Sequence, residues 1–433
     1  MPARLDASDP DFSGAFAALL AQKREVAEDV DAAAARIIAD VRARGDAALA
    51  EYSLRFDRFD LSAAGLRVSA EEIADAVRAS PPATLEALAL AHARIKTYHE
   101  RQRPQDVSFA DALGVELGWR WSAIAAVGLY VPGGTASYPS SVIMNAVPAK
   151  VAGVERVVMT VPASHGVVDP LVLAAANMAG VDEIYRVGGA QAIAALAYGT
   201  ATIAPVFKIV GPGNAYVAAA KRRVFGTVGI DMIAGPSEVL VLADGSANPD
   251  WIAADLIAQA EHDAAAQSIL ITDDAALADA VAASVERQLA SLPRRDIAAA
   301  SWRDFGAIVL VRALADALPL VDRLAPEHLE IMARDGEALS RGIRNAGAIF
   351  IGGHTPEAIG DYVGGSNHVL PTARSARFSS GLGVLDFMKR TSILRCGPDA
   401  LRALAPAAIA LGEAEGLHGH ARSVAIRLDQ RAA

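Results

Sequence analysis

The sequence predicts an α/β protein whose strands form parallel sheets. Two observations predict this class. From residue 115 onward, short β-branched or aromatic runs that end in glycine alternate with alanine-rich helical runs, the pattern of strands joined by crossover helices. The chain has 433 residues, of which 53% are hydrophobic and 21% are charged. It is therefore long enough for two or three domains with cores of their own.

The first hundred residues are predicted to be helical and to carry little chemistry. The predicted helices cover residues 12–24, 29–56, 69–80 and 83–103. Ser69 is an N-cap residue followed by acidic residues, which suits the start of a helix. We expect His92 and His99, which lie in the last of these helices, to be surface or packing residues.

The alternation then forms two successive sets. After strand-like runs at 115–121 and 124–134, predicted strands of the first set cover residues 156–161, 183–187 and 207–210. Those of the second set cover 239–243, 268–272, 307–311 and 348–352. Ligands of such sheets are expected beyond the carboxyl ends of the strands. Two further helices, at 398–411 and 417–428, form an arm that is too small for its own core and must pack on this chain or on a partner chain.

Composition excludes several classes of function. The formal net charge of -10 argues against a nucleic acid as the main partner, because phosphate binding needs clustered Lys and Arg. The acidic N-terminus does not resemble a signal peptide, and no apolar run approaches the roughly 18 residues of a membrane span. The single cysteine, Cys396, fits a reducing compartment and is expected to be a buried structural thiol. We therefore expect a cytoplasmic protein that binds a small molecule.

Three glycine loops in the first set could hold an anion. They are Tyr130-Val-Pro-Gly-Gly, Val187-Gly-Gly-Ala-Gln191 and Val210-Gly-Pro-Gly-Asn214. Each follows a strand and the latter two open helices, so backbone N–H groups are available for a pyrophosphate. None is a G-x-G-x-x-G fingerprint. Together the loops favour a nucleotide in an unusual site.

The second set offers metal ligands and acid–base groups. Gln259 and His262 are three positions apart on a helix, so they share one face. Together with Asp361 and one of the histidines at 368, 418 or 420, they would give a four-ligand shell of nitrogen and oxygen, compatible with zinc and less selectively with manganese or cobalt. Glu327 and His328 are adjacent and would contact different atoms of one ligand, an arrangement suited to proton transfer.

Taken together, these motifs resemble the histidinol dehydrogenase family. The strings that carry the resemblance are Gly128-Leu-Tyr-Val-Pro-Gly-Gly, Gly211-Pro-Gly-Asn-Ala-Tyr, Ala234-Gly-Pro-Ser-Glu, Gln259-Ala-Glu-His, Ala325-Pro-Glu-His-Leu, Gly360-Asp-Tyr, Asn367-His-Val-Leu-Pro-Thr and Phe378-Ser-Ser-Gly-Leu. The resemblance covers nearly the whole chain. It implies a zinc- and NAD-dependent homodimer, with one Zn²⁺ per subunit, that oxidises L-histidinol through L-histidinal to L-histidine.

The resemblance also implies a role for each site residue. The implied metal ligands are Gln259, His262, Asp361 and His420. The implied substrate contacts are these four with Ser237, His328 and Glu415. The implied NAD contacts are Tyr130, Gln191 and Asn214, and the implied catalytic pair for proton transfer is Glu327 and His328. His418 is an extra histidine beside His420 that the family pattern lacks.

The predicted organisation has four parts. Residues 1–24 form an N-terminal helical segment, and residues 25–129 with 238–381 form a Rossmann-like domain bearing the metal and catalytic residues. Residues 130–237 form a second Rossmann-like domain with the NAD loops. Residues 382–433 form a C-terminal helical arm, exchanged between subunits.

Two other functions stay open at this stage. A related dehydrogenase could oxidise another small alcohol, such as a sulfonated diol, with the same metal and NAD loops. The acidic residue Glu415 favours histidinol, because a cationic substrate is stabilised by a carboxylate. Alternatively, the chain could be a metal-binding or regulatory protein without turnover, which the intact Glu327-His328 pair argues against.

Overall fold

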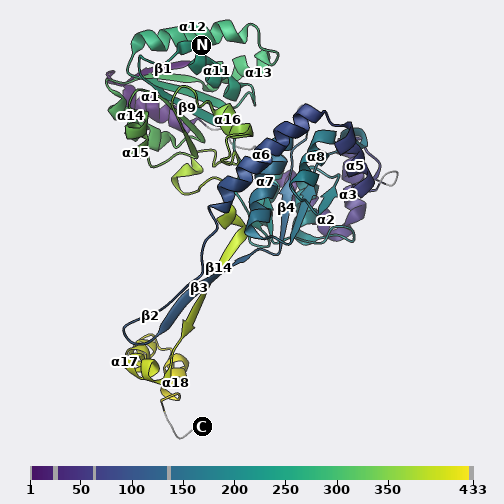
Figure 1. The fold of residues 1–433 in the computed structure, drawn as a ribbon, viewed down its shortest axis with the longest axis vertical. Coiled ribbons are helices and arrows are strands. Elements are labelled where there is room, and N and C mark those ends of the chain that lie inside the picture. The colour runs from purple at the N-terminus through teal and green to yellow at the C-terminus, as the bar shows by residue number, and fades with distance from the viewer. Residues whose placement is uncertain (1, 23–27, 62–64, 134–137, 429–433) are drawn as a thin grey trace. The chain divides into compact units, whose positions relative to one another are not determined.

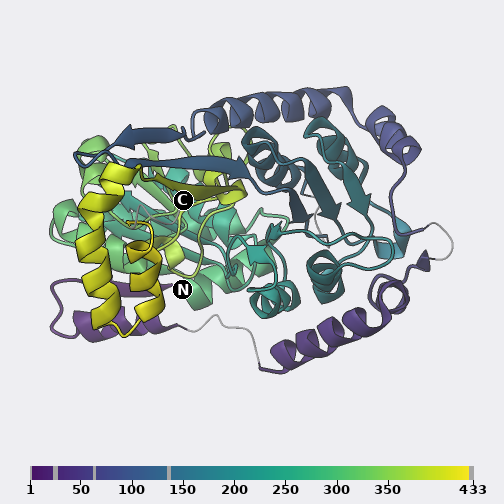
Figure 2. The same cartoon turned by 90° about the horizontal axis from the view of Figure 1, so that it is seen from below.

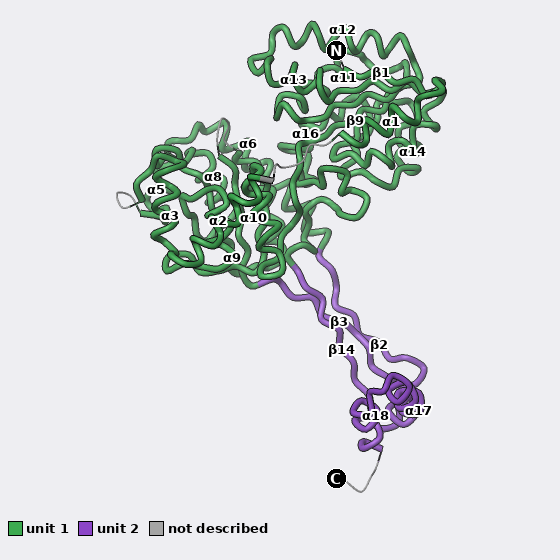
Figure 3. Tube along the Cα trace, turned by 180° about the vertical axis from the view of Figure 1, so that it is seen from behind, with its two compact units in different colours: residues 1–102, 125–387 green, residues 103–124, 388–433 purple. Residues whose placement is uncertain are grey.

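Two parallel β-sheets dominate the fold (Figure 1). The structure is a computed structural model and describes residues 2–22, 28–61, 65–133 and 138–428. Contacts divide the chain into two compact units (Figure 3). Residues 1–102 and 125–387 form the first unit, called the body, and residues 103–124 and 388–433 form the second, called the arm.

The first sheet of the body has six strands in the order β1-β11-β10-β9-β12-β13. Every neighbouring pair is parallel. The strands are β1 (Ala3–Asp6), β9 (Glu238–Ala243), β10 (Gln267–Thr272), β11 (Ala307–Leu310), β12 (His328–Met332) and β13 (Ala348–Ile351). The chain leaves β9 in one direction to form β10 and β11 and then returns to place β12 on the other side of β9.

Helices cover both faces of the six-stranded sheet. One hydrophobic core lies under α11 (Pro249–Ala260), α12 (Ala275–Leu289) and α13 (Arg295–Phe305). The core of the other face lies under α1 (Phe12–Ala21) and α14 (Leu314–Leu324), with α15 (Gly336–Arg341) beside them. The strands β9 and β10 are buried along their whole length, as expected for parallel strands with helices on both faces. The short helix α16 (Glu357–Tyr362) follows β13 and contacts α11.

The second sheet of the body has five parallel strands in the order β6-β5-β4-β7-β8. They are β4 (Ala126–Tyr130), β5 (Arg156–Thr160), β6 (Glu183–Tyr185), β7 (Lys208–Val210) and β8 (Gly229–Ile230). One face packs on α9 (Gly189–Tyr198) and α10 (Ala215–Val224), which α2 (Glu28–Arg44) and α3 (Asp46–Tyr52) cover from outside. On the other face lie α7 (Pro139–Ala152) and α8 (Pro170–Met178), with α5 (Ala70–Ala79) and α6 (Pro82–Glu100) outside them (Figure 2).

Short helical turns complete the body, and the arm has a sheet of its own. The turns are η1 (Ser53–Asp57), η2 (Ser164–Gly166), η3 (Ser375–Arg377) and η4 (Val384–Phe387). In the arm, β2 (Val107–Ala110), β3 (Glu116–Ala123) and β14 (Met388–Arg395) form an antiparallel sheet in the order β14-β3-β2. The helices α17 (Pro398–Ala414) and α18 (His418–Ala425) follow and pack on each other.

The predicted fold class is confirmed, and so is the helical cap at Ser69. The side chain of Ser69 accepts from Glu72 N–H while Glu72 returns a bond to Ser69 N–H, a capping box. Five strands were not predicted: β1, β2, β8, β12 and β14. Of these, β14 is exposed at nearly every residue and carries several charged side chains. Because neither face of the strand is buried, its sequence shows no hydrophobic alternation.

Three smaller expectations have definite outcomes. His99 is a packing residue, as expected, because it is buried and its Nδ1 lies 2.7 Å from the carbonyl oxygen of Ile95. Cys396 is half-buried, so the prediction of a buried thiol is wrong; it lies in the short link between β14 and α17. The last two residues of the predicted helix 12–24, and the domain boundary placed there, lie outside the described residues.

None of the described helices combines the length and apolar composition needed to cross a bilayer.

Candidate active site

The adjacent residues Glu327 and His328 lie where α14 ends and β12 begins. The chain reverses at Ala325, whose φ of 44° lies in the left-handed region, and Pro326 then directs it into the strand. Glu327 Oε2 accepts the N–H of Glu238 at 2.9 Å, and His328 Nδ1 lies 3.1 Å from the carbonyl oxygen of Glu238. Because a carbonyl only accepts, Nδ1 carries the proton and donates. The neighbouring strand β9 therefore fixes both side chains.

The other imidazole nitrogen of His328 is available to a ligand. His328 is 5% exposed, and its Nε2 has no hydrogen-bond partner among the described residues. Asp361 Oδ1 is the nearest charged atom, at 3.6 Å, which is longer than a hydrogen bond. A buried nitrogen that lacks a partner is costly unless a ligand supplies one. This atom is thus a candidate contact for a substrate hydroxyl.

Carboxyl groups surround His328 and change the proton affinities of the cluster. Glu357 Oε2 and Glu327 Oε2 lie 3.7 Å and 3.8 Å from Nδ1. Burial opposes the protonation of His328, but Glu327, Glu357 and Asp361 together raise its pKa well above the usual value. Burial also raises the pKa of Glu327 to about 7, so this carboxyl can release or accept a proton near neutral pH.

The candidate metal ligands of the body lie at the carboxyl end of α11 and in α16. Gln259 is 1% exposed, and its amide Nε2 has no hydrogen-bond partner among the described residues. Desolvation lowers the pKa of His262, and the charges of Asp361 and His328 also act on it, so these groups are neighbours. His368 does not present a free Nδ1, because that atom lies 2.9 Å from the carbonyl oxygen of Asp361. His368 thereby supports the backbone that carries Asp361.

These ligands are an incomplete set within the body. In the part of the chain that the structure describes, no group of three or more His, Cys, Asp or Glu side chains is arranged to hold a metal ion. Gln259 is of a different residue type, and His420 lies on α18 of the arm. A buried, unpartnered amide beside an imidazole and a carboxylate nevertheless fits a cation with nitrogen and oxygen ligands. The body alone supplies three of the four predicted ligands.

The candidate residues of the six-stranded sheet lie at the strand ends opposite to the expected ones. Ser237 and Glu327 precede β9 and β12, and Gln259 and His262 lie at the end of the helix that leads into β10. The candidate residues therefore lie at the amino ends of the strands of the six-stranded sheet, whereas the general expectation places a ligand beyond the carboxyl ends. Ser237 is half-buried, and its carbonyl oxygen accepts from Gln267 N–H at 3.0 Å.

The candidate NAD residues lie at the carboxyl ends of the five-stranded sheet. Tyr130 ends β4, and its buried hydroxyl oxygen accepts the N–H of Gly189 at 3.1 Å, which joins the first glycine loop to the second. Burial raises the pKa of Tyr130 to about 12. Gln191 is buried in the first turn of α9. Asn214 is the N-cap of α10, because its Oδ1 accepts from the N–H groups of Tyr216 and Val217. Gly134, the last glycine of the first loop, lies outside the described residues.

A buried ion pair holds the third glycine loop. Lys221 and Asp231 form it, with side chains 3% and 1% exposed. Lys221 Nζ donates to the carbonyl oxygen of Gly211 at 3.0 Å, and Asp231 Oδ2 accepts from Gly211 N–H at 2.7 Å. Gly211 has φ of 109°, and a Cβ there would lie 2.1 Å from the carbonyl oxygen of Tyr130. Only glycine permits so close an approach.

The arm carries the remaining predicted residues, Glu415 and His420. Glu415 is the C-cap of α17, and His420 lies in the first turn of α18. Both are exposed, as is the extra histidine, His418. The arm therefore offers a carboxylate and two imidazoles on its surface.

Two carboxyl groups of the cluster were not predicted from the sequence. They are Glu357 and Glu330, which are 2% and 1% exposed. Glu330 lies in β12, a strand that was not predicted, and Glu357 follows a proline, as helix-start acids often do. The proximity of Glu330 to Glu357 arises from pairing of β12 with β13, which no local pattern reveals.

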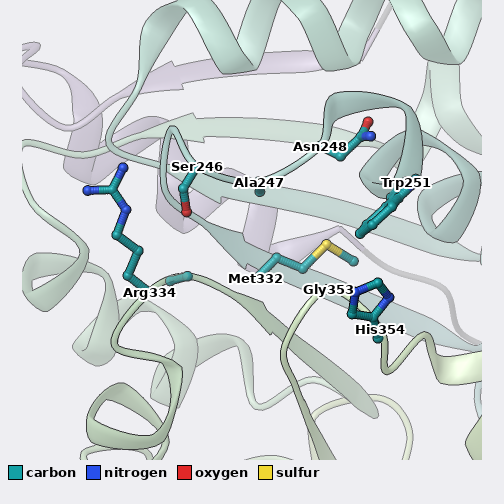
Figure 4. Close-up of a pocket in the computed structure, with 9 residues that line it drawn as sticks. Ser246, Ala247, Asn248, Trp251, Met332, Arg334, Gly353 and His354 are labelled. Atoms are coloured by element: carbon teal, nitrogen blue, oxygen red, sulfur yellow. The ribbon is translucent and has the colours of Figure 1, made fainter.

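A cavity on the six-stranded sheet contains none of the candidate site residues. It has a volume of 320 Å³ and lies where β9 and β12 end, lined by Ser246, Asn248, Trp251, Met332, Arg334 and His354 among others (Figure 4). It is thus at the strand ends opposite to those that carry Glu327 and His328.

Fold and site together define an α/β protein of the kind expected for an oxidoreductase, with a buried histidine–carboxylate centre on one parallel sheet and glycine loops at the strand ends of another. The family model for histidinol dehydrogenase matches residues 20–428. Histidinol dehydrogenases of Rhodopseudomonas palustris and Bradyrhizobium diazoefficiens are each 70% identical to this chain; the matches cover 100% and 99% of this chain and 100% of both relatives. The crystal structure of histidinol dehydrogenase from Elizabethkingia anophelis superposes with a TM-score of 0.95 at 33% identity, covering 100% of this chain and 99% of the other.

The chain belongs to the histidinol dehydrogenase family. The resemblance on which the site residues were predicted is thereby confirmed. The role of each residue stays a prediction.

Proposed function

We propose that the chain is a zinc-dependent histidinol dehydrogenase that catalyses the last two steps of histidine biosynthesis. The reaction is a four-electron oxidation of L-histidinol through L-histidinal to L-histidine, with two NAD as acceptors. The observation that carries the proposal is the buried His328, whose Nδ1 is engaged by a carbonyl and whose Nε2 has no partner among the described residues. An imidazole whose Nδ1 is engaged in this way is aimed through Nε2 at a bound alcohol, and it is a general base once Nε2 has lost its proton.

The proposed metal ligands are Gln259, His262, Asp361 and His420. Support comes from the orphaned amide of Gln259, which a metal or a metal-bound group would satisfy. Although burial opposes it, contact with His328 and the charges of His368 and His262 hold the pKa of Asp361 below its usual value, so this ligand is ionised at neutral pH. When bound, zinc would hold and polarise the substrate, which can itself offer an imidazole, an amine and a hydroxyl.

His328 and Glu327 are proposed to divide the proton transfers. In the first oxidation, Nε2 of His328 takes the hydroxyl proton of histidinol as the carbon-bound hydride leaves to NAD. In the second, Glu327 takes a proton from water as that water adds to the aldehyde, and the hydrate then loses its hydride to a second NAD. The pKa of about 7 for Glu327 suits a group that must accept a proton and later release it.

The remaining contacts would set specificity and bind the cofactor. We assign Ser237 and Glu415 to the substrate together with the four metal ligands and His328. A carboxylate such as Glu415 stabilises a cationic amine or imidazole. Tyr130, Gln191 and Asn214 are assigned to NAD, because their loops lie at the amino ends of α9 and α10, where an anionic pyrophosphate is favoured.

We propose that the working enzyme is a homodimer whose arm completes the site of the other subunit. Support comes from the arm itself, since β2 is exposed at every residue and β14 at all but one. Phe109, Leu394 and Leu411 are 49%, 67% and 64% exposed. Such surfaces are rare in monomers and mark association sites. No nucleic acid or membrane partner is required, and a cytoplasmic location fits the single cysteine.

The division between His328 and Glu327 is tested with the two substrates separately. Glu327→Gln is expected to slow the oxidation of supplied histidinal more than that of histidinol, because only the aldehyde step needs activated water. Wild-type histidinal oxidation should rise as pH passes through about 7, since Glu327 acts as a base when it is deprotonated, and the variant should lose this rise. Equal losses on both substrates would refute the assignment. Formation of NADH from histidinol, but not from a sulfonated diol, excludes the rival substrate.

The dimer is tested by mixing two inactive variants. His262→Ala removes a ligand from the body, and His420→Ala removes one from the arm. If the arm serves the partner's site, a heterodimer has one site with both wild-type residues and regains a sizeable fraction of activity. If heterodimers form, as shown by mass, and stay inactive, His420 acts in its own subunit and the exchange is wrong.

A further inference from the structure

Glu330 is a buried carboxyl that the proposed proton transfers do not use. It lies in the middle of β12, two residues after His328, so both side chains point to the sheet face covered by α11. It is 1% exposed. Burying a carboxyl in a strand core is costly unless its oxygens are bonded. Its bonding partners therefore indicate what this residue is for.

Glu330 lies between two helices. Oε1 accepts the N–H of Glu357, the first residue of α16, at 2.6 Å. Oε2 receives no N–H or hydroxyl group from the described residues. The carboxyl groups of Glu330 and of Asp255, on α11, act on each other's pKa, so the two groups are neighbours. Two neighbouring carboxyl groups can form a hydrogen bond only by sharing a proton.

The environment decides which of the two keeps the proton. Burial and the negative charges of Asp255 and Glu357 raise the pKa of Glu330 far above its usual value. Burial also raises the pKa of Asp255, but its bond with Glu330 opposes that rise. Glu330 is thus the protonated donor and Asp255 the acceptor. A neutral acid of this kind can donate to one helix while it accepts from the other.

The two helices that Glu330 bonds are those that carry the candidate metal ligands. Asp255 is one turn before Gln259 on α11, and Glu357 is one turn before Asp361 on α16. We propose that Glu330 is a positioning residue that bonds both ligand-bearing helices to the strand that carries His328, and so sets the spacing of Gln259, His262 and Asp361. This inference rests on the metal set of the proposed function. Groups that orient metal ligands typically change affinity about 10- to 100-fold when removed.

The experiment measures zinc affinity of the purified full-length protein by competition with a chromogenic chelator, with circular dichroism to verify folding. Glu330→Leu fills the space without either bond and is expected to weaken zinc binding about 10- to 100-fold. Glu330→Gln can still accept from Glu357 N–H and donate to Asp255, so it should stay within about threefold of wild type. Glu286→Leu, on the exposed surface of α12, is the matched control and should not change affinity.

Rescue by glutamine separates positioning from mere packing. If Glu330 only filled space, leucine would be tolerated as well as glutamine. The inference is overturned if folded Glu330→Leu binds zinc as tightly as wild type, or if Glu330→Gln weakens binding as much as leucine does. Should Glu330→Leu not fold, Asp255→Leu breaks one of the two bonds and must weaken zinc binding about 10-fold; unchanged affinity in that variant also overturns the inference. A wild-type protein that binds no zinc instead refutes the proposed metal set.

Discussion

The two sheets of the body carry their candidate residues at opposite ends of their strands. In the five-stranded sheet, Tyr130 ends a strand and Asn214 follows one, and both lie beside the amino ends of helices. In the six-stranded sheet, Glu327 precedes a strand, and Gln259 lies at the carboxyl end of α11. Helix amino ends favour anions and helix carboxyl ends favour cations. The same architecture therefore suits a pyrophosphate at one sheet and a metal ion with a cationic substrate at the other.

The largest effect is expected from removing the metal ion from the candidate site of the six-stranded sheet. Chelation, or His262→Ala, should abolish turnover and lower the zinc content measured by atomic absorption, because one of the proposed ligands is lost. Binding of NAD, followed by fluorescence titration, should stay near wild type, since its loops belong to the other sheet. His92→Ala, in α6, is the control and should keep its zinc. Full turnover in metal-free protein would contradict the metal assignment.

The next largest effect should follow from removing only the proposed base, His328. His328→Ala is expected to slow histidinol oxidation by about 10²- to 10⁴-fold, the usual contribution of a positioned general base. Zinc content should not fall, because His328 is not among the proposed ligands. Single-turnover kinetics with histidinol measure the effect. A rate within a few fold of wild type would show that another group takes the proton.

Binding of NAD at the glycine loops of the five-stranded sheet can be weakened without changing any proposed metal ligand. Lys221→Met leaves Asp231 buried and unpaired, which typically costs about 3–5 kcal/mol of folding free energy. Because the pair holds the loop at Gly211, the Michaelis constant for NAD should rise while zinc affinity stays unchanged. Urea unfolding and initial-rate kinetics give the two readouts. A variant whose zinc affinity falls as much as its NAD affinity would show that the candidate sites of the two sheets are not independent.

The smallest effect is expected at the cap of α10. Asn214→Ala removes the side chain that accepts from Tyr216 and Val217 N–H, which should cost about 0.5–2 kcal/mol of stability. If Asn214 also contacts NAD, the Michaelis constant for NAD will rise, whereas Asn214→Asp, which retains the cap, should restore the stability. Loss of stability with an unchanged Michaelis constant would limit Asn214 to capping.

Local patterns explain which parts of this structure could be predicted. The parallel sheets follow from hydrophobic runs punctuated by glycine, and Gln259 with His262 follows from helical spacing. The carboxyl cluster could not be found this way, because Glu330, Glu357 and Asp255 meet only through strand pairing and helix packing. The strand β14 also escaped notice because its partner β3 is distant in sequence. The predicted domain boundaries stay a prediction.

The position of the only cysteine gives the arm an intrinsic attachment point for a probe. Cys396 is half-buried in the arm, in the link between β14 and α17. A maleimide dye would therefore label one defined position per chain without any engineered residue. Energy transfer between donor- and acceptor-labelled chains, mixed in equal amounts, would follow the exchange of subunits in real time. Dilution would then give the dissociation rate of the assembly independently of catalysis.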